Sequence, residues 1–234
     1  MNRLKRQISI LFSKKTESRI LRNQFENNID FRSTISSEVD IGTNNHFYPY
    51  SVIGQDSQMH GKDKALVSEN LKRVIIGNNN IFREFTTVHL PAEEITSIGN
   101  GNIFMCYSHV PHDARIGNFN KFTNSVQLGG FAVISDYCYF GLNSSVQQRL
   151  TIGSYVTVGM NTSVAINVPP FTIVMGNSGQ VVDTNNRALR KVGCTNSEIK
   201  YLKSHVLSSG KMEIPEINNK TVVNAWKEFQ ILLR

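Results

Sequence analysis

Two histidines and an aspartate stand close together in the stretch HVPHDARIGN, residues 109–118. The imidazole of His112 has the chemistry of a general base, because histidine side chains in general can change protonation near neutral pH. Asp113 beside it could hold the ring in one tautomer. Two other hypotheses stay open: His109 and His112 as ligands of a metal ion, and His112 as an ordinary exposed histidine. The elements that position these side chains decide between the hypotheses.

A hexapeptide repeat surrounds this stretch. Large apolar residues recur at every sixth position from Ile98 to Val164, in a chain whose overall apolar content is 40%. Four positions after each of them stands a residue that is mostly small or β-branched, and glycine often follows the large residue directly. This pattern is typical of a parallel β-helix, in which each hexapeptide forms one short strand and one turn. We expect the large residues to fill the interior and the glycines to supply the unusual dihedral angles of the turns.

The repeat also predicts which residues share an edge. Three hexapeptides make a coil of about 18 residues, coils stack about 4.8 Å apart, and helices of this kind wind left-handed. His112 lies two residues after the inward Val110, so its side chain should point outward from a turn. One coil later the same slot holds Gly130, and two coils later it holds Gln148. The neighbouring slot gives a second column of Asp113, Phe131 and Arg149.

The repeat also runs earlier in the chain, with two interruptions. Its inward residues are Ile29, Ile35, Ile41, Phe47, Ile53, Ile76, Phe82 and Val88. The irregular spacings predict two loops that leave the β-helix, around 55–74 and 89–97. Loops that leave a regular scaffold often carry binding residues.

The C-terminal fifth follows a helical pattern. Thr195-Asn-Ser-Glu198 forms a capping box ahead of apolar residues at helical spacing, and a second helix is predicted over 219–233. We therefore predict an all-β fold with a small α-helical appendage, divided into three parts. These are a basic arm at 1–28, a left-handed parallel β-helix at 29–182 and a helical domain at 183–234.

Composition limits the partners. The net charge of +7 and the pI of about 9.4 favour an acidic partner through electrostatic steering. No nucleic-acid-binding motif is recognisable, so we expect a phosphorylated small molecule or an acidic carrier protein instead. Cys106, Cys138 and Cys194 are too few and too scattered for a disulfide framework or a metal knuckle, which favours the reducing cytoplasm. The arm MNRLKRQISILFSKK fits either a solvated segment or peripheral contact with anionic lipid.

Four stretches carry a resemblance to a known family. They are IGQDSQ (53–58), IIGNNNIFREFTTVH (75–89), IGNGNIFMCYSHVPHDARIGN (98–118) and VPPFTIVMGN (168–177). They resemble the UDP-N-acetylglucosamine O-acyltransferases, which perform the first acylation of lipid A synthesis, over roughly residues 29–207. The resemblance implies a homotrimer with active sites in clefts between neighbouring chains and no permanently bound cofactor or metal. It also implies an acyl carrier protein thioester as donor and a UDP-amino sugar as acceptor.

The resemblance assigns roles to single residues. His112 matches the general base, Asp113 its neighbouring carboxylate, and Gly130 the glycine whose backbone N–H serves the thioester oxyanion. The residues that match substrate-binding positions are Gln58, His109, Gln148, Asn185 and Lys191, the last replacing an arginine. Met160 stands where a family residue closes the acyl groove, so a thioether there predicts a short or medium acyl group.

The sequence also departs from the family. Phe131 replaces the usual histidine after the oxyanion glycine, and Gln147 replaces the histidine of a His-Gln pair. The residues that match the general base and the oxyanion glycine are better retained than the residues that would bind the nucleotide. Two alternatives therefore remain: a sugar acetyltransferase of surface polysaccharide synthesis that uses acetyl-CoA, and a paralogue without catalytic activity.

Overall fold

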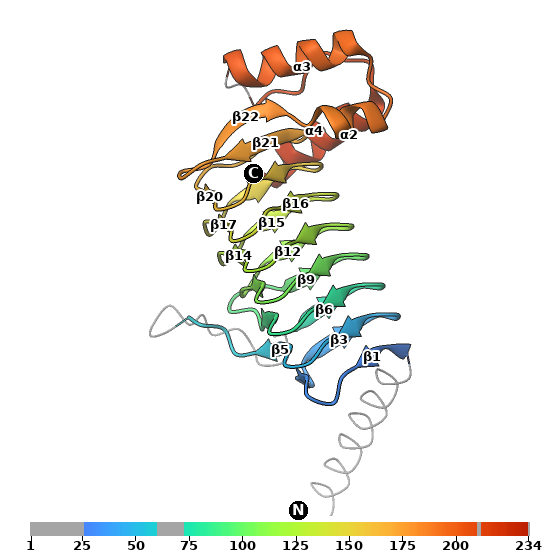
Figure 1. Ribbon diagram of the computed structural model, residues 1–234, viewed down its shortest axis with the longest axis vertical. Helices are drawn as coiled ribbons and strands as arrows, with labels where there is room; N and C mark the ends of the chain where they lie inside the picture. Colours follow the sequence, from blue (N-terminus) through green and yellow to red (C-terminus); the bar gives the residue numbers. More distant parts are fainter. Residues whose placement is uncertain (1–25, 60–72, 210–211, 234) are drawn as a thin grey trace, which may run out of the picture.

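The computed structural model describes residues 26–59, 73–209 and 212–233. The chain rises coil upon coil from β1 at one end to three helices at the other (Figure 1). The predicted parallel β-helix with a C-terminal helical segment is confirmed. Residues 1–25 of the basic arm and 60–72 of the first predicted loop lie outside the described residues.

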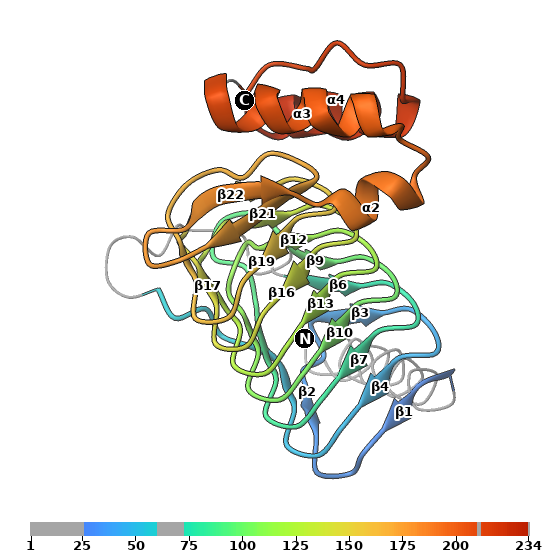
Figure 2. The same ribbon diagram turned by 45° about the horizontal axis from the view of Figure 1, so that its top comes forward.

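Three parallel sheets form the faces of the β-helix, as the tilted view in Figure 2 shows. The nine-stranded sheet contains, in spatial order, β1 (Asn28–Ile29), β4 (His46–Phe47), β7 (Ile81–Phe82), β10 (Ile103–Phe104), β13 (Lys121–Phe122), β16 (Tyr139–Phe140), β19 (Thr157–Val158), β21 (Thr172–Met175) and, antiparallel to β21, β22 (Gln180–Thr184). The seven-stranded sheet contains β2 (Thr34–Ile35), β5 (Val52–Gln55), β8 (Thr87–His89), β11 (His109–Val110), β14 (Gln127–Leu128), β17 (Ser145–Val146) and β20 (Ser163–Val164). The six-stranded sheet contains β3 (Val39–Ile41), β6 (Val74–Ile76), β9 (Thr96–Ile98), β12 (Arg115–Ile116), β15 (Val133–Ile134) and β18 (Thr151–Ile152).

The interior is filled by the residues that the repeat predicts. All large residues at six-residue spacing from Ile98 to Val164 are buried. Phenylalanines in five successive coils stack on one another, with ring centroids 4.7–4.9 Å apart. Each buried side chain of this size contributes about 1.5–3 kcal/mol, which fixes the register between coils. That register is 18 residues in every strand pairing from β9 to β20, as in the pair His109 and Gln127, and it shortens to 16 between β19 and β21.

The glycines of the repeat act differently from our expectation. The left-handed turn dihedrals fall three residues after the inward residue, where non-glycine residues stand, such as Asp113 (φ 59°) and Phe131 (φ 60°). The glycines one position after the inward residue face the backbone of the next coil instead. A Cβ on Gly129 would lie 2.4 Å from the backbone N of Gln148. The prediction that these glycines supply turn dihedrals is therefore wrong, because the close stacking of coils requires them.

The helical end covers the last coils. It contains α2 (Asn186–Lys191), α3 (Asn196–Ser209) and α4 (Lys220–Leu232). The capping box is present: the N–H of Glu198 donates to Thr195 Oγ1, and the N–H of Thr195 donates to Glu198 Oε2. Trp226 is fully buried in a second apolar cluster with Phe171. Within the described ranges, no helix has the length and apolar character needed to cross a membrane.

Candidate active site

His112 and Asp113 form a hydrogen-bonded dyad in the turn between β11 and β12. Nδ1 of His112 lies 2.9 Å from Oδ2 of Asp113, and the side chains are 15% and 1% exposed. The left-handed dihedral of Asp113 turns the chain so that its carboxylate reaches the preceding imidazole. Because an ionised carboxylate only accepts hydrogen bonds, Nδ1 must carry the proton. Nε2 is therefore left with the lone pair that a general base needs.

The loop between β8 and β9 holds this carboxylate in place. Three backbone N–H groups donate to it, those of Ala92 (2.9 Å), Glu93 (3.1 Å) and Glu94 (2.6 Å). Burial alone would raise the pKa of Asp113, but these N–H groups and His112 hold it below its ordinary value. The second predicted loop thus supports the dyad through its backbone, so Asp113 stays ionised and the tautomer of His112 stays fixed.

Gly130 lies against the imidazole, one coil later in the chain. A Cβ at this position would come within 2.5 Å of Cε1 and 2.7 Å of Nε2 of His112. The predicted column is real, since the N–H of Phe131 donates to the carbonyl of His112 and that of Arg149 to the carbonyl of Gly130. Among the described residues, the N–H of Gly130 donates to no acceptor. A proton acceptor and a backbone donor therefore share one edge, which we call the histidine edge: the turns 111–114, 129–132 and 147–150.

His109 lies beside the dyad in β11. Its Nδ1 is 2.8 Å from Oγ1 of Thr87, and its ring meets that of His89 edge-on with centroids 4.9 Å apart. Burial, followed by the neighbouring His89 and His112, lowers the pKa of His109 to about 4. Burial also lowers the pKa of His89. Both rings therefore stay neutral near pH 7 and serve as hydrogen-bonding groups.

His89 is a site residue that the sequence reasoning missed. It lies 23 residues before His112, which is not a multiple of six. The pairing of Val110 with Val88 shows that this coil has 22 residues, because the loop adds four. When those four extra residues are left out of the count, His89 occupies the position of Pro111 in the preceding coil, on the histidine edge.

Of the other predicted site residues, one lies in the turns of the histidine edge and four lie outside those turns. Gln148 is exposed on the histidine edge, in the column of His112 and Gly130. Met160 follows β19, so it lies on a different edge, between the nine-stranded and seven-stranded sheets, and is 67% exposed. Asn185 caps α2: its Oδ1 accepts from Ala188 N–H and its Nδ2 donates to the carbonyl of Tyr155. Lys191 is exposed at the end of that helix, and Gln58 is exposed after β5.

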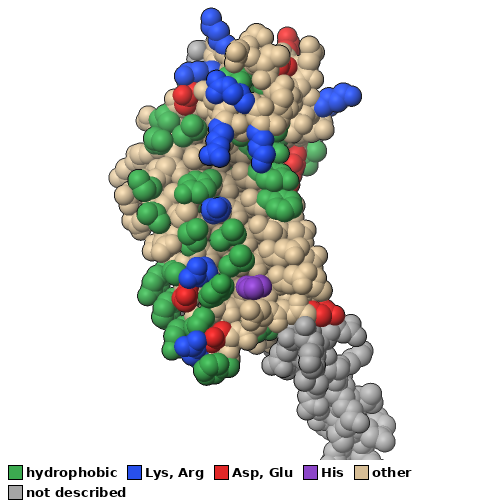
Figure 3. All heavy atoms as spheres, turned by 45° about the vertical axis from the view of Figure 1, so that its right-hand side comes forward, with side chains coloured by type: hydrophobic (Ala, Val, Ile, Leu, Met, Phe, Trp, Pro, Cys, Tyr) green, Lys and Arg blue, Asp and Glu red, His purple; other side chains and the backbone are tan. Residues whose placement is uncertain are grey.

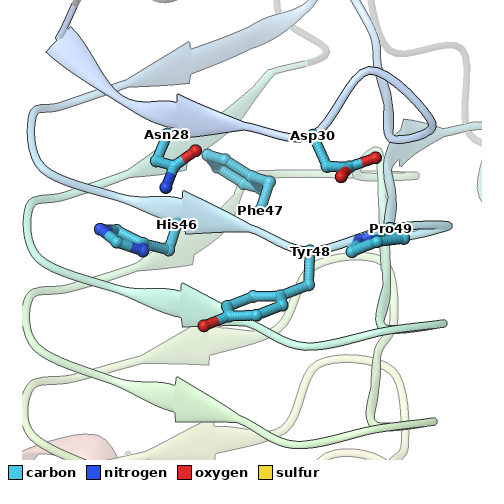
Figure 4. Close-up of a pocket in the computed structure, with 6 residues that line it drawn as sticks. All are labelled: Asn28, Asp30, His46, Phe47, Tyr48 and Pro49. Atoms are coloured by element: carbon cyan, nitrogen blue, oxygen red, sulfur yellow. The ribbon is translucent and has the colours of Figure 1, made fainter.

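A shallow hollow of about 160 Å³ lies elsewhere, on the outer face of the first coils (Figure 4). It is lined by Asn28, Asp30, His46, Phe47, Tyr48 and Pro49, all from the β1 and β4 region. Asp30 is already paired with Arg32, whose hydrogen bonds lower the pKa of Asp30 to about 2. None of these residues belongs to the histidine edge, so we assign the chemistry to the dyad. Across the described part of the chain, no group of three or more His, Cys, Asp or Glu could hold a metal ion.

Several known proteins resemble this chain in sequence. No protein-family model matches the chain. The acyl-(acyl-carrier-protein)–UDP-N-acetylglucosamine O-acyltransferase of Nautilia profundicola is 36% identical over 180 residues, which cover 73% of this chain and 66% of that protein. A protein of the same name from Anaeromyxobacter dehalogenans is 35% identical over 154 residues, covering 64% of this chain and 57% of that protein. The alignments thus span 57–66% of the length of these relatives, which is less than two thirds.

A solved structure extends the likeness along the chain. The UDP-N-acetylglucosamine acyltransferase of Francisella novicida is 25% identical, with a TM-score of 0.64 over 88% of this chain and 86% of that chain. The sequence comparisons and the fold comparison therefore indicate the same family. The chain belongs to the UDP-N-acetylglucosamine O-acyltransferase family.

Proposed function

We propose that this protein transfers an acyl group from an acyl carrier protein thioester to a hydroxyl of a UDP-amino sugar, UDP-N-acetylglucosamine being the expected acceptor. The observation that carries the proposal is the dyad of His112 and Asp113 placed against Gly130, whose backbone N–H donates to no acceptor among the described residues. This pairing of a fixed base with a backbone donor suits attack by an alcohol on a thioester.

The reaction then runs in two steps, addition to the thioester and loss of the thiolate. In the first step, Nε2 of His112 takes the proton of the sugar hydroxyl while the hydroxyl oxygen bonds to the thioester carbonyl carbon. The carbonyl oxygen becomes an oxyanion, which the N–H of Gly130 stabilises. When the carbon–sulfur bond breaks, the leaving thiolate takes the proton from His112, which returns to its starting state. Asp113 stays ionised throughout and stabilises the imidazolium between the two steps.

The separation of the predicted acyl-groove residue from the dyad supports a homotrimer. His112 and Met160 lie on different edges of one prism. A single chain therefore presents the two residues on separate edges. A neighbouring copy that presents its Met160 edge to the histidine edge would complete the groove. An exposed thioether at that point favours a short or medium acyl group.

The helical end supports an acidic donor protein. Lys and Arg side chains gather there in the space-filling view (Figure 3). The exposed ones on α2, α3 and α4 are Arg187, Arg190, Lys191, Lys200, Lys203, Lys220 and Lys227. An acidic carrier protein would be steered to such a surface, and its phosphopantetheine arm would deliver the thioester. Three free cysteines fit the cytoplasm as the place of reaction.

The decisive experiment incubates the purified protein with UDP-N-acetylglucosamine and acyl carrier protein carrying C4 to C16 acyl groups, followed by mass spectrometry. We expect an O-acylated UDP-sugar with a preference for short or medium chains. Transfer from acetyl-CoA alone would replace the donor assignment with that of a sugar acetyltransferase. Absence of transfer to any of a panel of UDP-sugars would contradict the proposal, and preference for C14 or longer would contradict the role of Met160.

The dyad is tested by His112→Gln. We expect kcat to fall by about 10²–10⁴, the range that a general base supplies, with the free energy of unfolding nearly unchanged. His46→Gln is a matched control, because His46 is an exposed histidine in β4 with no contact to the dyad. Full activity of His112→Gln would eliminate His112 as the base.

A further inference from the structure

Phe131 occupies an unusual place among the corner residues of the β-helix. Its ring meets that of His112 at 83°, with centroids 5.3 Å apart. On the side of the next coil, the guanidinium of Arg149 lies 4.0 Å from the centroid of the Phe131 ring. Phe131 is therefore held between a dyad residue of one coil and a cation of another.

Other corner rings make different contacts. Phe119 has the same left-handed dihedral and the same place in its hexapeptide, yet it stacks face to face on Tyr137, at 14° and 5.1 Å. Tyr137 continues that stack onto Tyr155. These rings form a ladder of like residues, whereas Phe131 has no ring above it in the next coil, where Arg149 stands.

The contact matters because one hydrogen bond does not fix an imidazole. The bond to Asp113 holds Nδ1, but the ring can still tilt about that point, which would move Nε2 away from Gly130. The near-perpendicular rings of His112 and Phe131 are in edge-to-face contact, and Arg149 covers the Phe131 ring. A positive ring edge against a negative ring face is the favoured arrangement of such a pair.

Arg149 in turn restrains Phe131. Its guanidinium stacks on the ring as a cation–π contact, and its backbone N–H is bonded to the carbonyl of Gly130. The backbone N–H of Phe131 is bonded to the carbonyl of His112. The two columns of the histidine edge are therefore tied together at both backbone and side chain.

We propose that Phe131 is a positioning residue for His112, which holds the imidazole so that Nε2 stays beside Gly130, and that Arg149 holds Phe131. The effects on kcat that this inference predicts rest on the proposed function. The sequence marked Phe131 only as a departure from the family, and its contacts give it a role of its own.

The kinetic test compares Phe131→Ala, Phe131→Tyr and Phe119→Ala in the full-length protein. An edge-to-face pair changes a rate by roughly 2- to 13-fold, so we expect Phe131→Ala to lower kcat about tenfold and to change KM less than about twofold. Phe131→Tyr keeps the ring and should retain activity. Phe119→Ala removes a ring from the matched corner without touching the dyad and should leave kcat unchanged.

Two further variants keep the test decisive if Phe131→Ala does not fold. Phe131→Leu keeps an apolar side chain without a π face, and Arg149→Met keeps the stem without the cation. We expect the first to lower kcat nearly as much as Phe131→Ala and the second by about twofold, as an exposed cation–π contact allows. Wild-type kcat in the Phe131 variants, or an equal loss in Phe119→Ala, would overturn the inference.

A second readout needs no activity. The ring current of Phe131 should shift the signal of a carbon-bound ring proton of His112 in the NMR spectrum, assigned by its disappearance in His112→Gln. The shift should be lost in Phe131→Leu and kept in Phe119→Ala. If the shift is present but no donor and acceptor pair reacts, the proposed function fails and the positioning contact stands. If the wild-type protein lacks the shift, the positioning role fails whatever the activity.

Discussion

The edge between the six-stranded and nine-stranded sheets repeats one residue in successive coils, whereas the histidine edge changes its residue in every coil. The repeated residues are Asn27, Asn45, Asn80, Asn102 and Asn120, and we call this the asparagine edge. Both edges are built by the same hexapeptide turn on the same stack of coils. The difference between them lies in what their polar groups bind.

On the asparagine edge, polar groups bind one another. The Nδ2 of Asn102 donates to Oδ1 of Asn80 and to the carbonyl of Gly117, and the same two bonds recur one coil earlier from Asn80. Such a ladder satisfies buried amides and stabilises the fold. On the histidine edge, Nε2 of His112 and the N–H of Gly130 are left for another molecule. A polar residue repeated from coil to coil therefore indicates a role in stability here, and an edge whose residue changes in every coil indicates a role in chemistry.

The largest effect is expected from breaking the ladder. Asn102→Ala removes three side-chain hydrogen bonds in a fully buried position, including the one its Oδ1 accepts from the N–H of Asn120. We expect the free energy of unfolding, measured with urea, to fall by about 3–4 kcal/mol. The kcat of the folded protein should not change. A loss of kcat without loss of stability would contradict the division between the two edges.

Asn120→Ala is the matched control for that change. The Nδ2 of Asn120 is buried without a partner, and its Oδ1 accepts only the N–H of Cys138. Because one bond is lost instead of three, we expect a cost of about 1 kcal/mol. Equal costs for the two variants would mean that the ladder bonds contribute little.

The histidine edge should respond in the opposite way to Gly130→Ala. The new methyl group would overlap the imidazole of His112, whose displacement by about 1 Å should lower kcat about 10²-fold. The free energy of unfolding should change little, because the clash is with a side chain that can move and not with backbone. Gly159→Ala is the control, since its Cβ would meet only the side chains of Met175 and Thr162 closely. Wild-type kcat for Gly130→Ala would remove Gly130 from the site.

Much of this contrast was predictable from the sequence. Side chains eighteen residues apart share an edge because three hexapeptides close one coil, so His112, Gly130 and Gln148 were aligned by counting. The buried interior followed from the same period, and the capping box located the start of α3. Regular spacing is informative because stacked coils allow one register only.

The parts that could not be predicted depend on groups without a sequence signature. Backbone N–H groups of Ala92, Glu93 and Glu94 hold Asp113, and any residue except proline has such a group. His89 was hidden because a loop of unknown path changes the count. The role of glycine was misjudged because the distance between coils, and not the turn, excludes a side chain at Gly129.

The smallest expected effect is a pH dependence of stability that only the histidine edge should produce, since amides do not titrate. The pKa of His109 is about 4 in the folded protein, against about 6.5 in an unfolded chain. Between these values the unfolded state binds more protons, so stability is lost as the pH falls from about 6.5 toward 4. Allowing for partial exposure to solvent, we expect about 1 kcal/mol between pH 7 and pH 5. Urea unfolding of His109→Gln at both values should show a correspondingly smaller loss, with the remainder due to His89, whose pKa is lowered in the same direction. Equal losses in the variant and the wild-type protein would show that His109 is not held neutral by its neighbours, and would remove the electrostatic distinction between the two edges.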